Sequence, residues 1–461
     1  MFQNMIRFGV FLFAGLAGAY SSSETMALEN KDNEDLREAV KRLESRINKI
    51  ESQKKSNTSD SALDRWTKGL EKDQDGNIYK NGNFRLMDSS LNLITSVGAS
   101  NKKGAALRSL QGGGHDPKRR GFTLQQAELS FYAAVDPYFT GETHFTTTID
   151  DEGETVFELE EAFLTTSSLP HGLEVEMGHF LTEFGRHNTQ HAHSWLWMDQ
   201  PIIHTRVFGS DGMRGLGARV GWNVPLSWQS EVHYSAQNAA GENMLSFLAN
   251  DEVYTDRALA GRTHTEPPTN GLKDFVHLIR WENGFDINSE LSGQIGFSHL
   301  MGPNATGREG ETQISGVDLV IKWMPEKNNK GWPFVKFEAE YIDRQFGADA
   351  DTTNNLTAKT FGDRGGYAQI FYGFVKDWAV GVRYEKVEGD SRQSVGGNEA
   401  DIYRNQRERI SPLVSWDISE FSKMRLQYNY DRAEHLTPNH DAHSVFLGFN
   451  ISLGAHPAHK Y

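Results

Sequence analysis

The chain has 461 residues, 37% of them apolar, and a formal net charge of −15 at pH 7. This acidity argues against a nucleic-acid partner, because binding to phosphates requires a basic surface. The low apolar fraction fits a barrel whose strands are apolar on one face only, and it equally fits a soluble all-β enzyme. The chain contains no cysteine, which is consistent with export.

Residues 1–19 have the features of a secretory signal peptide. A single basic residue, Arg7, precedes an apolar run that ends in small residues. We expect cleavage after Ala19, with Ala27 as the alternative site. A membrane anchor is less favoured, because the run is shorter than the roughly 20 residues that a helical span requires.

Residues 28–55 are predicted to form a short periplasmic coiled coil. Apolar residues recur at alternating spacings of four and three between charged residues, at Leu36, Val40, Leu43, Ile47 and Ile50. A helix this short needs partner helices in water. The segment from Arg46 to Glu51 resembles the arginine–apolar–x–x–apolar–glutamate motif of trimeric coiled coils, in which the arginine pairs with a glutamate of a neighbouring chain. We therefore expect a homotrimer; the alternative is an amphipathic helix lying on its own barrel. Residues 56–83 are polar and are predicted to be a linker.

Residues 84–461 show repeated period-two alternation. In the segment around residue 128, Ala127, Leu129 and Phe131 alternate with polar residues, which is typical of a strand with one wet face. Strands are expected to begin near residues 90, 122, 139, 155, 173, 214, 227, 274, 288, 313, 333, 366, 378, 407, 422 and 443. The predicted fold class is an all-β membrane protein, an antiparallel transmembrane β-barrel of about 16 strands preceded by the coiled coil.

The connections between these strands alternate between short and long. Outer-membrane barrels have short periplasmic turns and long external loops, so this alternation predicts the orientation of the chain. Tryptophan, which prefers the membrane–water interface, supports the assignment. Seven tryptophans flank the short turns: Trp222, Trp228, Trp281, Trp323, Trp332, Trp378 and Trp416. Both chain ends, and with them the coiled coil, are then expected in the periplasm.

Several local sequences resemble the phosphate-selective porin O and P family. They are the Gly-Asn-Phe-Arg-Leu lead-in at Gly82–Leu86, the tract from Phe163 with Phe184-Gly185-Arg186, and the ending at residues 454–459. Together with the signal peptide, the coiled coil and the strand number, this resemblance implies a trimeric diffusion channel. It leaves the solute open.

The connection 182–212 is the third external loop of the predicted barrel, and in 16-stranded porins the third external loop folds inward and narrows the pore. Its mixture of charged and aromatic residues suits a constriction that selects by size and electric field. The candidate constriction residues are Glu183, Arg186, His187, His191, His193, Trp195 and Asp199. The alternative is an ordinary exposed loop.

The polar faces of the strands carry opposite charges on opposite sides of the predicted barrel. The acidic wall consists of Glu128, Glu142, Glu158, Glu160, Glu174 and Glu176. The basic wall consists of Lys322, Lys336, Arg344, Arg383, Arg409 and Arg425, with Glu338 and Glu340 among them. Such walls would create a transverse field, because low-dielectric surroundings focus it. The alternative is that these residues only keep the lumen wet.

No motif indicates catalysis, and we expect neither an enzyme nor a cofactor. The spacing His187-x-x-x-His191-x-His193 could ligate zinc or copper, but the flexible loop spacing argues against a metal site. The predicted function is a trimeric outer-membrane porin, in contact with outer-membrane lipids, for passive diffusion of small hydrophilic solutes or ions. Two alternatives are a channel selective for phosphate, another anion or a metal, and a structural outer-membrane anchor with a periplasmic coiled-coil tether.

Overall fold

The computed structural model describes residues 70–72, 78–80, 87–110, 112–150, 153–251, 261–389 and 404–454. The predicted signal peptide and coiled coil lie outside these residues, as do the lead-in motif at 82–86 and residues 455–459. The predicted linker is described only at the short strands β1 (Leu70–Lys72) and β2 (Ile78–Lys80).

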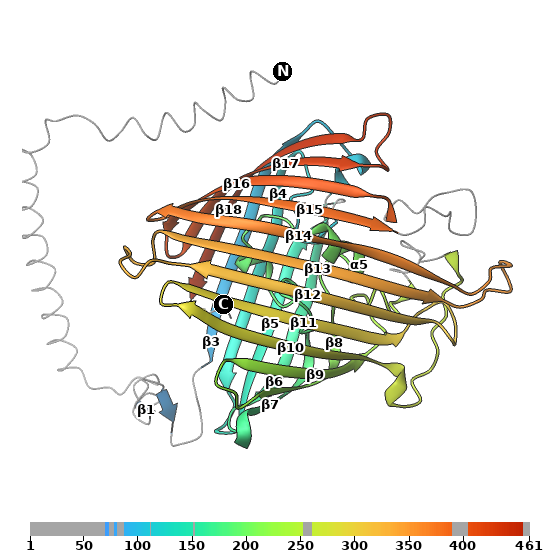
Figure 1. Cartoon of the computed structure of the whole chain (residues 1–461), viewed down its shortest axis with the longest axis horizontal. Coiled ribbons are helices and arrows are strands. Elements are labelled where there is room, and N and C mark those ends of the chain that lie inside the picture. The colour runs from blue at the N-terminus through green and yellow to red at the C-terminus, as the bar shows by residue number, and fades with distance from the viewer. Residues whose placement is uncertain are drawn as a thin grey trace, which may run out of the picture. The chain divides into compact units, whose positions relative to one another are not determined.

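Within the described ranges, sixteen strands form one closed antiparallel barrel, in which β18 pairs with β3 to complete the circle (Figure 1). The strands are β3 (Asp88–Ser100), β4 (Gly121–Ala134), β5 (Phe139–Ile149), β6 (Thr155–Thr166), β7 (Leu173–Leu181), β8 (Arg214–Asn223), β9 (Ser230–Asn238), β10 (Phe275–Asn288), β11 (Leu291–Pro303), β12 (Glu311–Trp323), β13 (Phe334–Ala348), β14 (Lys359–Val375), β15 (Trp378–Gly389), β16 (Arg407–Ser419), β17 (Ser422–Ala433) and β18 (Asp441–Gly454). The predicted fold class is confirmed for the barrel.

A strand stands at each of the sixteen predicted positions. The largest difference is at β14, which begins at Lys359 rather than near residue 366. Gly362, Gly365 and Gly366 interrupt the side-chain alternation there, so the first part of the strand lacks the pattern that marks the rest. The ladder nevertheless continues through these glycines to pair with β13.

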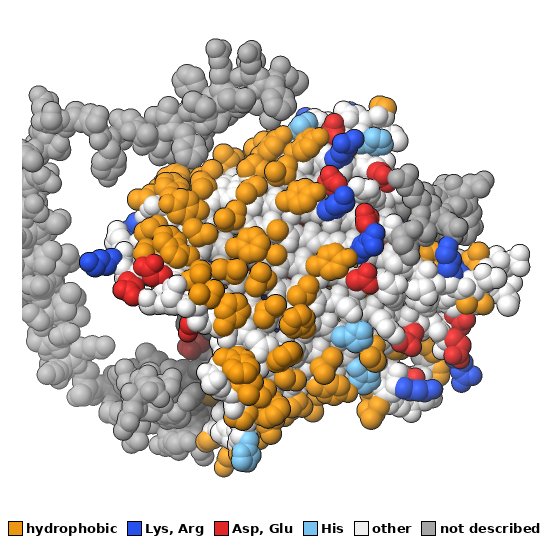
Figure 2. All heavy atoms as spheres, in the orientation of Figure 1, with side chains coloured by type: hydrophobic (Ala, Val, Ile, Leu, Met, Phe, Trp, Pro, Cys, Tyr) orange, Lys and Arg blue, Asp and Glu red, His pale blue; other side chains and the backbone are white. Residues whose placement is uncertain are grey.

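The two faces of the strands differ as the alternation predicts. On β4, Glu128 and Ser130 are buried inside the barrel, whereas Phe122 and Leu129 are exposed on its outside. Figure 2 shows apolar side chains gathered in a broad band on the outer face, with charged side chains beyond it. This outer surface suits contact with lipid.

The ends of the apolar band are marked by different residue types. At the short-turn end, Trp378 and Trp416 pair across β15 and β16 with ring centroids 5.3 Å apart. Toward the long-loop end, exposed ion pairs replace apolar residues, with Nη2 of Arg364 lying 2.6 Å from a carboxylate oxygen of Glu388. This sequence of aromatic residues, apolar residues and charges is typical of a bilayer-spanning band.

The helices of the described segments are short. They are α4 (Ala105–Arg108), α5 (Ile202–Phe208) and the 3₁₀ turns η1 (Pro170–Gly172), η2 (Ala192–Ser194) and η4 (Leu272–Asp274). None of the helices in this part of the chain has the length and apolar character needed to cross a membrane.

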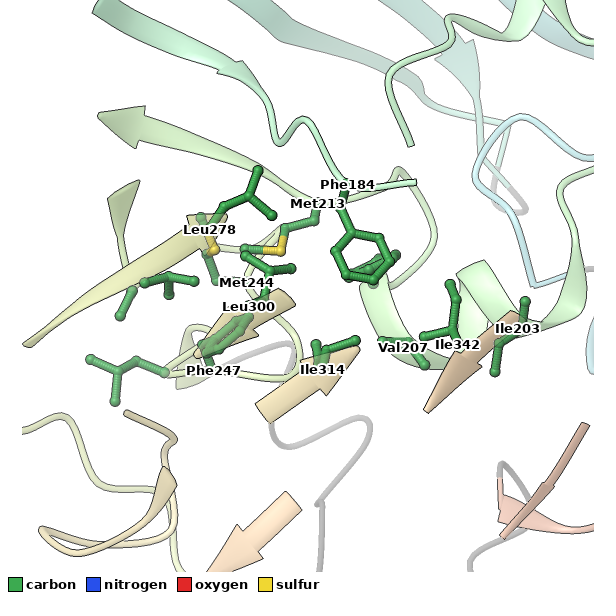
Figure 3. Packing of buried hydrophobic residues seen from close by; sticks show 14 of the residues in the cluster. Phe184, Ile203, Val207, Met213, Met244, Phe247, Leu278, Leu300, Ile314 and Ile342 are labelled. Carbon is green, nitrogen blue, oxygen red and sulfur yellow. The ribbon is translucent and has the colours of Figure 1, made fainter. Parts of the chain in front are cut away.

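Part of the barrel interior is packed with apolar side chains. Helix α5 and the loop after β9 contribute Ile203, Val207 and Phe247, which meet inward-facing residues of the wall (Figure 3). The wall residues are Val276, Leu278, Leu300, Ile314, Ile342 and Val387. Full burial of each such side chain stabilises by roughly 1.5–3 kcal/mol, so this core holds the loops against the wall. Part of the inward face of these strands is therefore apolar, whereas the alternation predicts strands that are apolar on the outer face only.

Candidate functional site

A cavity of about 1490 Å³ opens inside the barrel and reaches its short-turn end, where Lys376, Asp377 and Phe421 line it. Its charged lining comes from strands, turns and the loop between β7 and β8. The acidic lining residues are Glu142, Glu161, Glu174, Glu176, Glu183, Asp377, Asp417 and Glu420. The basic lining residues are Arg186, Arg219, Lys330, Lys336, Lys376 and Lys423. Carboxylates therefore outnumber lysine and arginine side chains around this water-accessible space.

The loop 182–213, which joins β7 to β8, crosses the barrel interior. It turns inward at Gly185, whose φ is 63° and where a Cβ would overlap the carboxylate of Glu340 on β13. Glycine is the residue that adopts this conformation without strain. The backbone N–H of Gly185 donates to Oγ of Ser298 on β11, 3.1 Å away. The loop thus contacts the wall opposite β7 within a few residues of leaving it.

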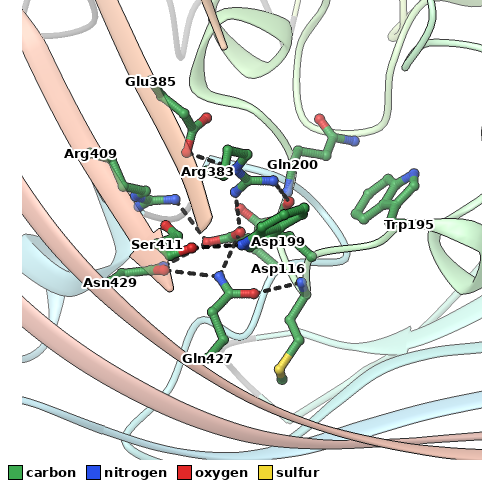
Figure 4. A network of polar contacts seen from close by, with 12 residues as sticks. Asp116, Trp195, Asp199, Gln200, Arg383, Glu385, Arg409, Ser411, Gln427 and Asn429 are labelled. Carbon is green, nitrogen blue, oxygen red and sulfur yellow. Dashed lines mark hydrogen bonds and ion pairs between the residues drawn. The ribbon is translucent and has the colours of Figure 1, made fainter. Parts of the chain in front are cut away.

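The centre of the loop is fixed by Asp199, which is 0% exposed (Figure 4). Its carboxylate forms ion pairs with Arg383 on β15 and with Nη1 of Arg409 on β16, the latter at 2.8 Å. It also accepts hydrogen bonds from the side-chain amides of Gln427 and Asn429 on β17, at 2.8 and 2.7 Å. Burial alone raises the pKa of Asp199, but the two guanidiniums outweigh burial and hold this pKa below its ordinary value.

The neighbouring loop residues are held through their backbone. Nη1 of Arg425 on β17 donates to the carbonyl oxygens of Trp195 and Trp197, at 2.7 and 3.1 Å. The indole N–H of Trp197 donates to the carbonyl of Ser411, at 2.9 Å. Three residues of the predicted basic wall, Arg383, Arg409 and Arg425, therefore anchor the loop.

Beside the loop, a much smaller cavity, here called the neck, adjoins the large one. A second cavity of about 10 Å³ shares Leu181 and Gln190 with the large cavity, and His187 and His204 also line it. The rings of these two histidines are 4.8 Å apart. Burial and the neighbouring His204 hold the pKa of His187 well below its ordinary value. The neck is therefore lined by an uncharged imidazole at neutral pH.

The three histidines of the predicted metal-binding spacing separate. His187 packs against Trp195 and His204 at the neck. His191 and His193 lie together beside the acidic wall, with Nδ1 of His193 2.7 Å from Oε2 of Glu128. Burial alone lowers the pKa of His191, but Glu160 and Glu128 outweigh it and hold this pKa well above its ordinary value.

The six residues of the predicted acidic wall lie on β4 to β7. Glu142, Glu174 and Glu176 line the large cavity, and Glu128 and Glu160 are buried beneath the loop. Arginines of β8 counter part of this charge. Arg214 pairs with Glu158. Arg219 contacts Glu174, Glu176 and the loop residue Glu183 at 3.2, 2.8 and 2.7 Å.

The predicted basic wall is equally mixed. Nη2 of Arg344 lies 2.6 Å from Asp363, and Nζ of Lys336 lies 2.8 Å from Glu338, which also has Arg186 of the loop at 3.5 Å. Lys322 points inward beside Lys336, its partner in the ladder. Charges are thus paired within each wall, so the transverse contrast is smaller than the sequence alone indicates.

Glu161 and His144 are among the inward-facing residues near the loop that were not predicted from the sequence. Strict alternation directs either Glu160 or Glu161 inward, but β6 contains a register shift opposite His144 and Phe145, and both glutamates are buried. His144 lies two residues after Glu142 on β5, so the alternation predicts that both side chains face the lumen.

Comparison with known proteins places the barrel among outer-membrane folds. No family model matches the chain. An uncharacterized protein of Aquifex aeolicus (strain VF5) is 29% identical over 399 residues, which span 82% of this chain and 80% of that protein. The outer-membrane channel DcaP of Acinetobacter baumannii is 10% identical with a TM-score of 0.50, covering 80% of this chain and 97% of that one. An anion-selective porin from Comamonas acidovorans is 12% identical with a TM-score of 0.49, covering 80% and 99%. At these identities the likeness to solved structures is one of fold: this chain has a 16-stranded barrel similar to that of DcaP.

Proposed function

We propose that this protein is an outer-membrane channel of the porin type, through which small hydrophilic solutes or ions diffuse passively. The observation that carries the proposal is the cavity of about 1490 Å³ inside a barrel with an apolar outer face. A sealed barrel used only as an anchor has no need of a large, charge-lined interior space. A barrel that conducts solutes requires one.

The loop 182–213 acts as the constriction of this channel. The neck beside His187 and His204 adjoins the large cavity, and residues of the loop line it. The anchoring of Asp199 to β15, β16 and β17 supports a fixed rather than a swinging constriction. A fixed constriction sets an upper limit on solute size.

The channel prefers small cations weakly or passes both signs. Carboxylates outnumber lysine and arginine side chains around the large cavity, and the net charge of the chain is −15. Both facts disfavour the alternative of a channel selective for phosphate or another anion. A reversal potential measured in a potassium chloride gradient tests this, and a strong chloride preference would contradict it.

The remaining parts of the proposal concern assembly and export. Residues 1–19 direct the chain to the periplasm and are removed, residues 28–55 form the trimeric coiled coil there, residues 56–83 connect it, and residues 84–461 span the outer membrane as a homotrimer. The heptad spacing and the arginine–glutamate motif at Arg46 and Glu51 support the trimer.

Liposome swelling with uncharged sugars of increasing size tests the channel itself. Entry through the folded chain should become slower as solute size increases, because loop 182–213 limits passage. Liposomes that contain folded protein and admit no sugar or salt would contradict the proposal. Heat-dependent migration on gels establishes folding independently of transport.

A further inference from the structure

His191, in the loop that crosses the barrel, lies between two glutamates of β6. Its Nδ1 is 3.0 Å from Oε2 of Glu160, and its Nε2 is 2.8 Å from Oε2 of Glu161. Its ring also lies 4.5 Å from the ring of His144 on β5. Imidazole and carboxylate groups from three separate segments therefore converge inside the barrel.

The backbone of β6 is shaped for this convergence. Phe145 of β5 pairs with Leu159 and His144 pairs with Glu161, so Glu160 is an extra residue in the ladder. Both glutamates consequently point inward, at 4% and 6% exposure. A β-bulge of this kind re-aims side chains and is frequent beside functional sites.

The adjacent strands add two oriented groups. Oγ of Ser130 donates a hydrogen bond to Oε1 of Glu128, at 2.7 Å, and lies 2.9 Å from Nδ1 of His144. Because the hydroxyl proton is used for Glu128, Nδ1 of His144 is the donor in the second contact. The other nitrogen, Nε2, lies 3.6 Å from Oε2 of Glu142 and would exchange this contact for a ligand. A histidine whose Nδ1 is held in this way is common among metal ligands.

The cluster carries more negative than positive charge. Four carboxylates, Glu128, Glu142, Glu160 and Glu161, face three imidazoles, His144, His191 and His193. Even with every imidazole protonated, one negative charge is left, and four are left when the imidazoles are neutral. A divalent cation would offset this excess in a partly buried site.

We infer that Glu128, His144 and His191 bind a divalent transition-metal cation, with Zn²⁺ best suited to their imidazole and carboxylate groups. One potential ligand atom from each residue lies within 4.8 Å of the others. Zinc binds nitrogen and oxygen at about 2.0–2.2 Å, so the ligand atoms would approach one another by roughly 1 Å on binding. Both nitrogens of His191 face carboxylates, so His191 would release a proton to solvent and exchange one of these contacts for the cation. His144, His191 and Glu161 line the large cavity, which gives the cation a path from solvent.

This metal site consists of different residues from the His187-x-x-x-His191-x-His193 motif of the sequence. It lacks His187 and contains His144 and Glu128 from the barrel wall. Metal binding does not depend on conduction, because the cation would bind to an open channel and to a closed barrel alike. Glu160, Glu161 and His193 lie close enough to complete or support the coordination.

Titration of the full folded chain in detergent with Co²⁺ tests this inference. After removal of metals with EDTA, we expect one equivalent of Co²⁺ to bind with a visible d–d absorption band, and Zn²⁺ to displace it. His191→Gln and His144→Gln should each weaken binding about 10–100-fold. The matched control is His233→Gln on β9, a buried histidine 3.4 Å from Glu231, which should leave the affinity unchanged.

Two results would overturn the inference. One is folded wild-type protein that binds no stoichiometric Co²⁺; the other is equal affinity in wild type, His191→Gln and His144→Gln. If His191→Gln does not fold, His144→Gln still decides, because it leaves the loop and its Asp199 anchor unaltered. Zn²⁺ should also raise the thermal unfolding midpoint of the wild type and not that of His144→Gln.

Discussion

Replacing Asp199 with Asn should release the centre of the constriction loop. The carboxylate holds the loop to Arg383, Arg409, Gln427 and Asn429, all on the opposite wall. Asparagine has nearly the same volume but keeps only one acceptor oxygen, whereas Gln427 and Asn429 donate to different oxygens of Asp199. It therefore removes the charge that both guanidiniums face together with one amide hydrogen bond, so the variant tests the polar anchor as a whole.

The loss of stability depends on which acidic partners Arg383 and Arg409 retain in the variant. Removing one partner of a buried ion pair costs about 3–5 kcal/mol. Arg383 keeps Glu385 at 3.1 Å and Arg409 keeps Asp431 at 2.7 Å, so the lower end, about 3 kcal/mol, applies. Since about 1.4 kcal/mol corresponds to a factor of ten, the released state of this loop segment should become roughly a hundredfold more populated.

The assay combines stability with conductance. Urea unfolding in detergent should show the loss of about 3 kcal/mol, and single-channel recordings should show larger or noisier open currents. The matched control is Asp318→Asn, which breaks a buried pair with Arg280 at 2.6 Å between β12 and β10. It should cost similar stability and leave the conductance unchanged, because both residues lie on the wall.

One result would exclude Asp199 as the residue that holds the constriction in place. If Asp199→Asn lost stability as expected but kept the wild-type conductance and current noise, the Asp199 anchor would not determine the width of the channel. The apolar core around Phe184 and Val207 would then be the element that positions the loop.

Three further predictions concern the boundary of the outer apolar band, the coiled coil and the protonation of Asp116. Ile370→Arg places a charge in the outer apolar band and should destabilise the barrel by about 2–4 kcal/mol in lipid, whereas Gln345→Arg, beyond the band, should cost little; equal unfolding free energies would contradict the membrane boundary. Deleting residues 28–55 should weaken the trimer and keep the conductance, as checked by crosslinking and bilayer recording; an unaltered trimer would contradict the role of the coiled coil. Burial and nearby Asp199 raise the pKa of Asp116 to about 6 in the folded protein. Protonation of Asp116 therefore stabilises the fold at low pH, and this contribution is lost as the pH rises from about 4 to about 6. Asp116→Asn should therefore remove about 3 kcal/mol of pH dependence from the unfolding free energy between pH 4 and 8, and parallel curves for the two proteins would contradict this.

The barrel could be predicted because its pattern is local. Alternation in β4 depends only on which face of a strand meets lipid, so Glu128 and Leu129 reveal their directions within the sequence itself. The turns repeat this information along the chain, and tryptophans repeat it at several of the short turns. The start of β14 was predicted too far along the chain for the same reason. Gly362, Gly365 and Gly366 lack side chains, so alternation is incomplete over the first residues of this strand.

The interior was harder to predict because its contacts join distant segments. Nothing near Asp199 in the sequence indicates that Arg383 and Arg409 will face it. The bulge that turns both Glu160 and Glu161 inward breaks the very alternation used to assign faces. The apolar core had a weak signal, since Val276 and Leu278 are apolar at inward positions of β10. Their partners, however, come from loops whose folding the alternation does not describe.

Single-channel recording of the folded full-length protein in planar bilayers decides whether the chain forms a passive channel. We expect stable, stepwise conductance with no ion selectivity or a weak preference for cations. Protein that is folded by heat-dependent gel migration, inserts into the bilayer and yet carries no current would contradict it.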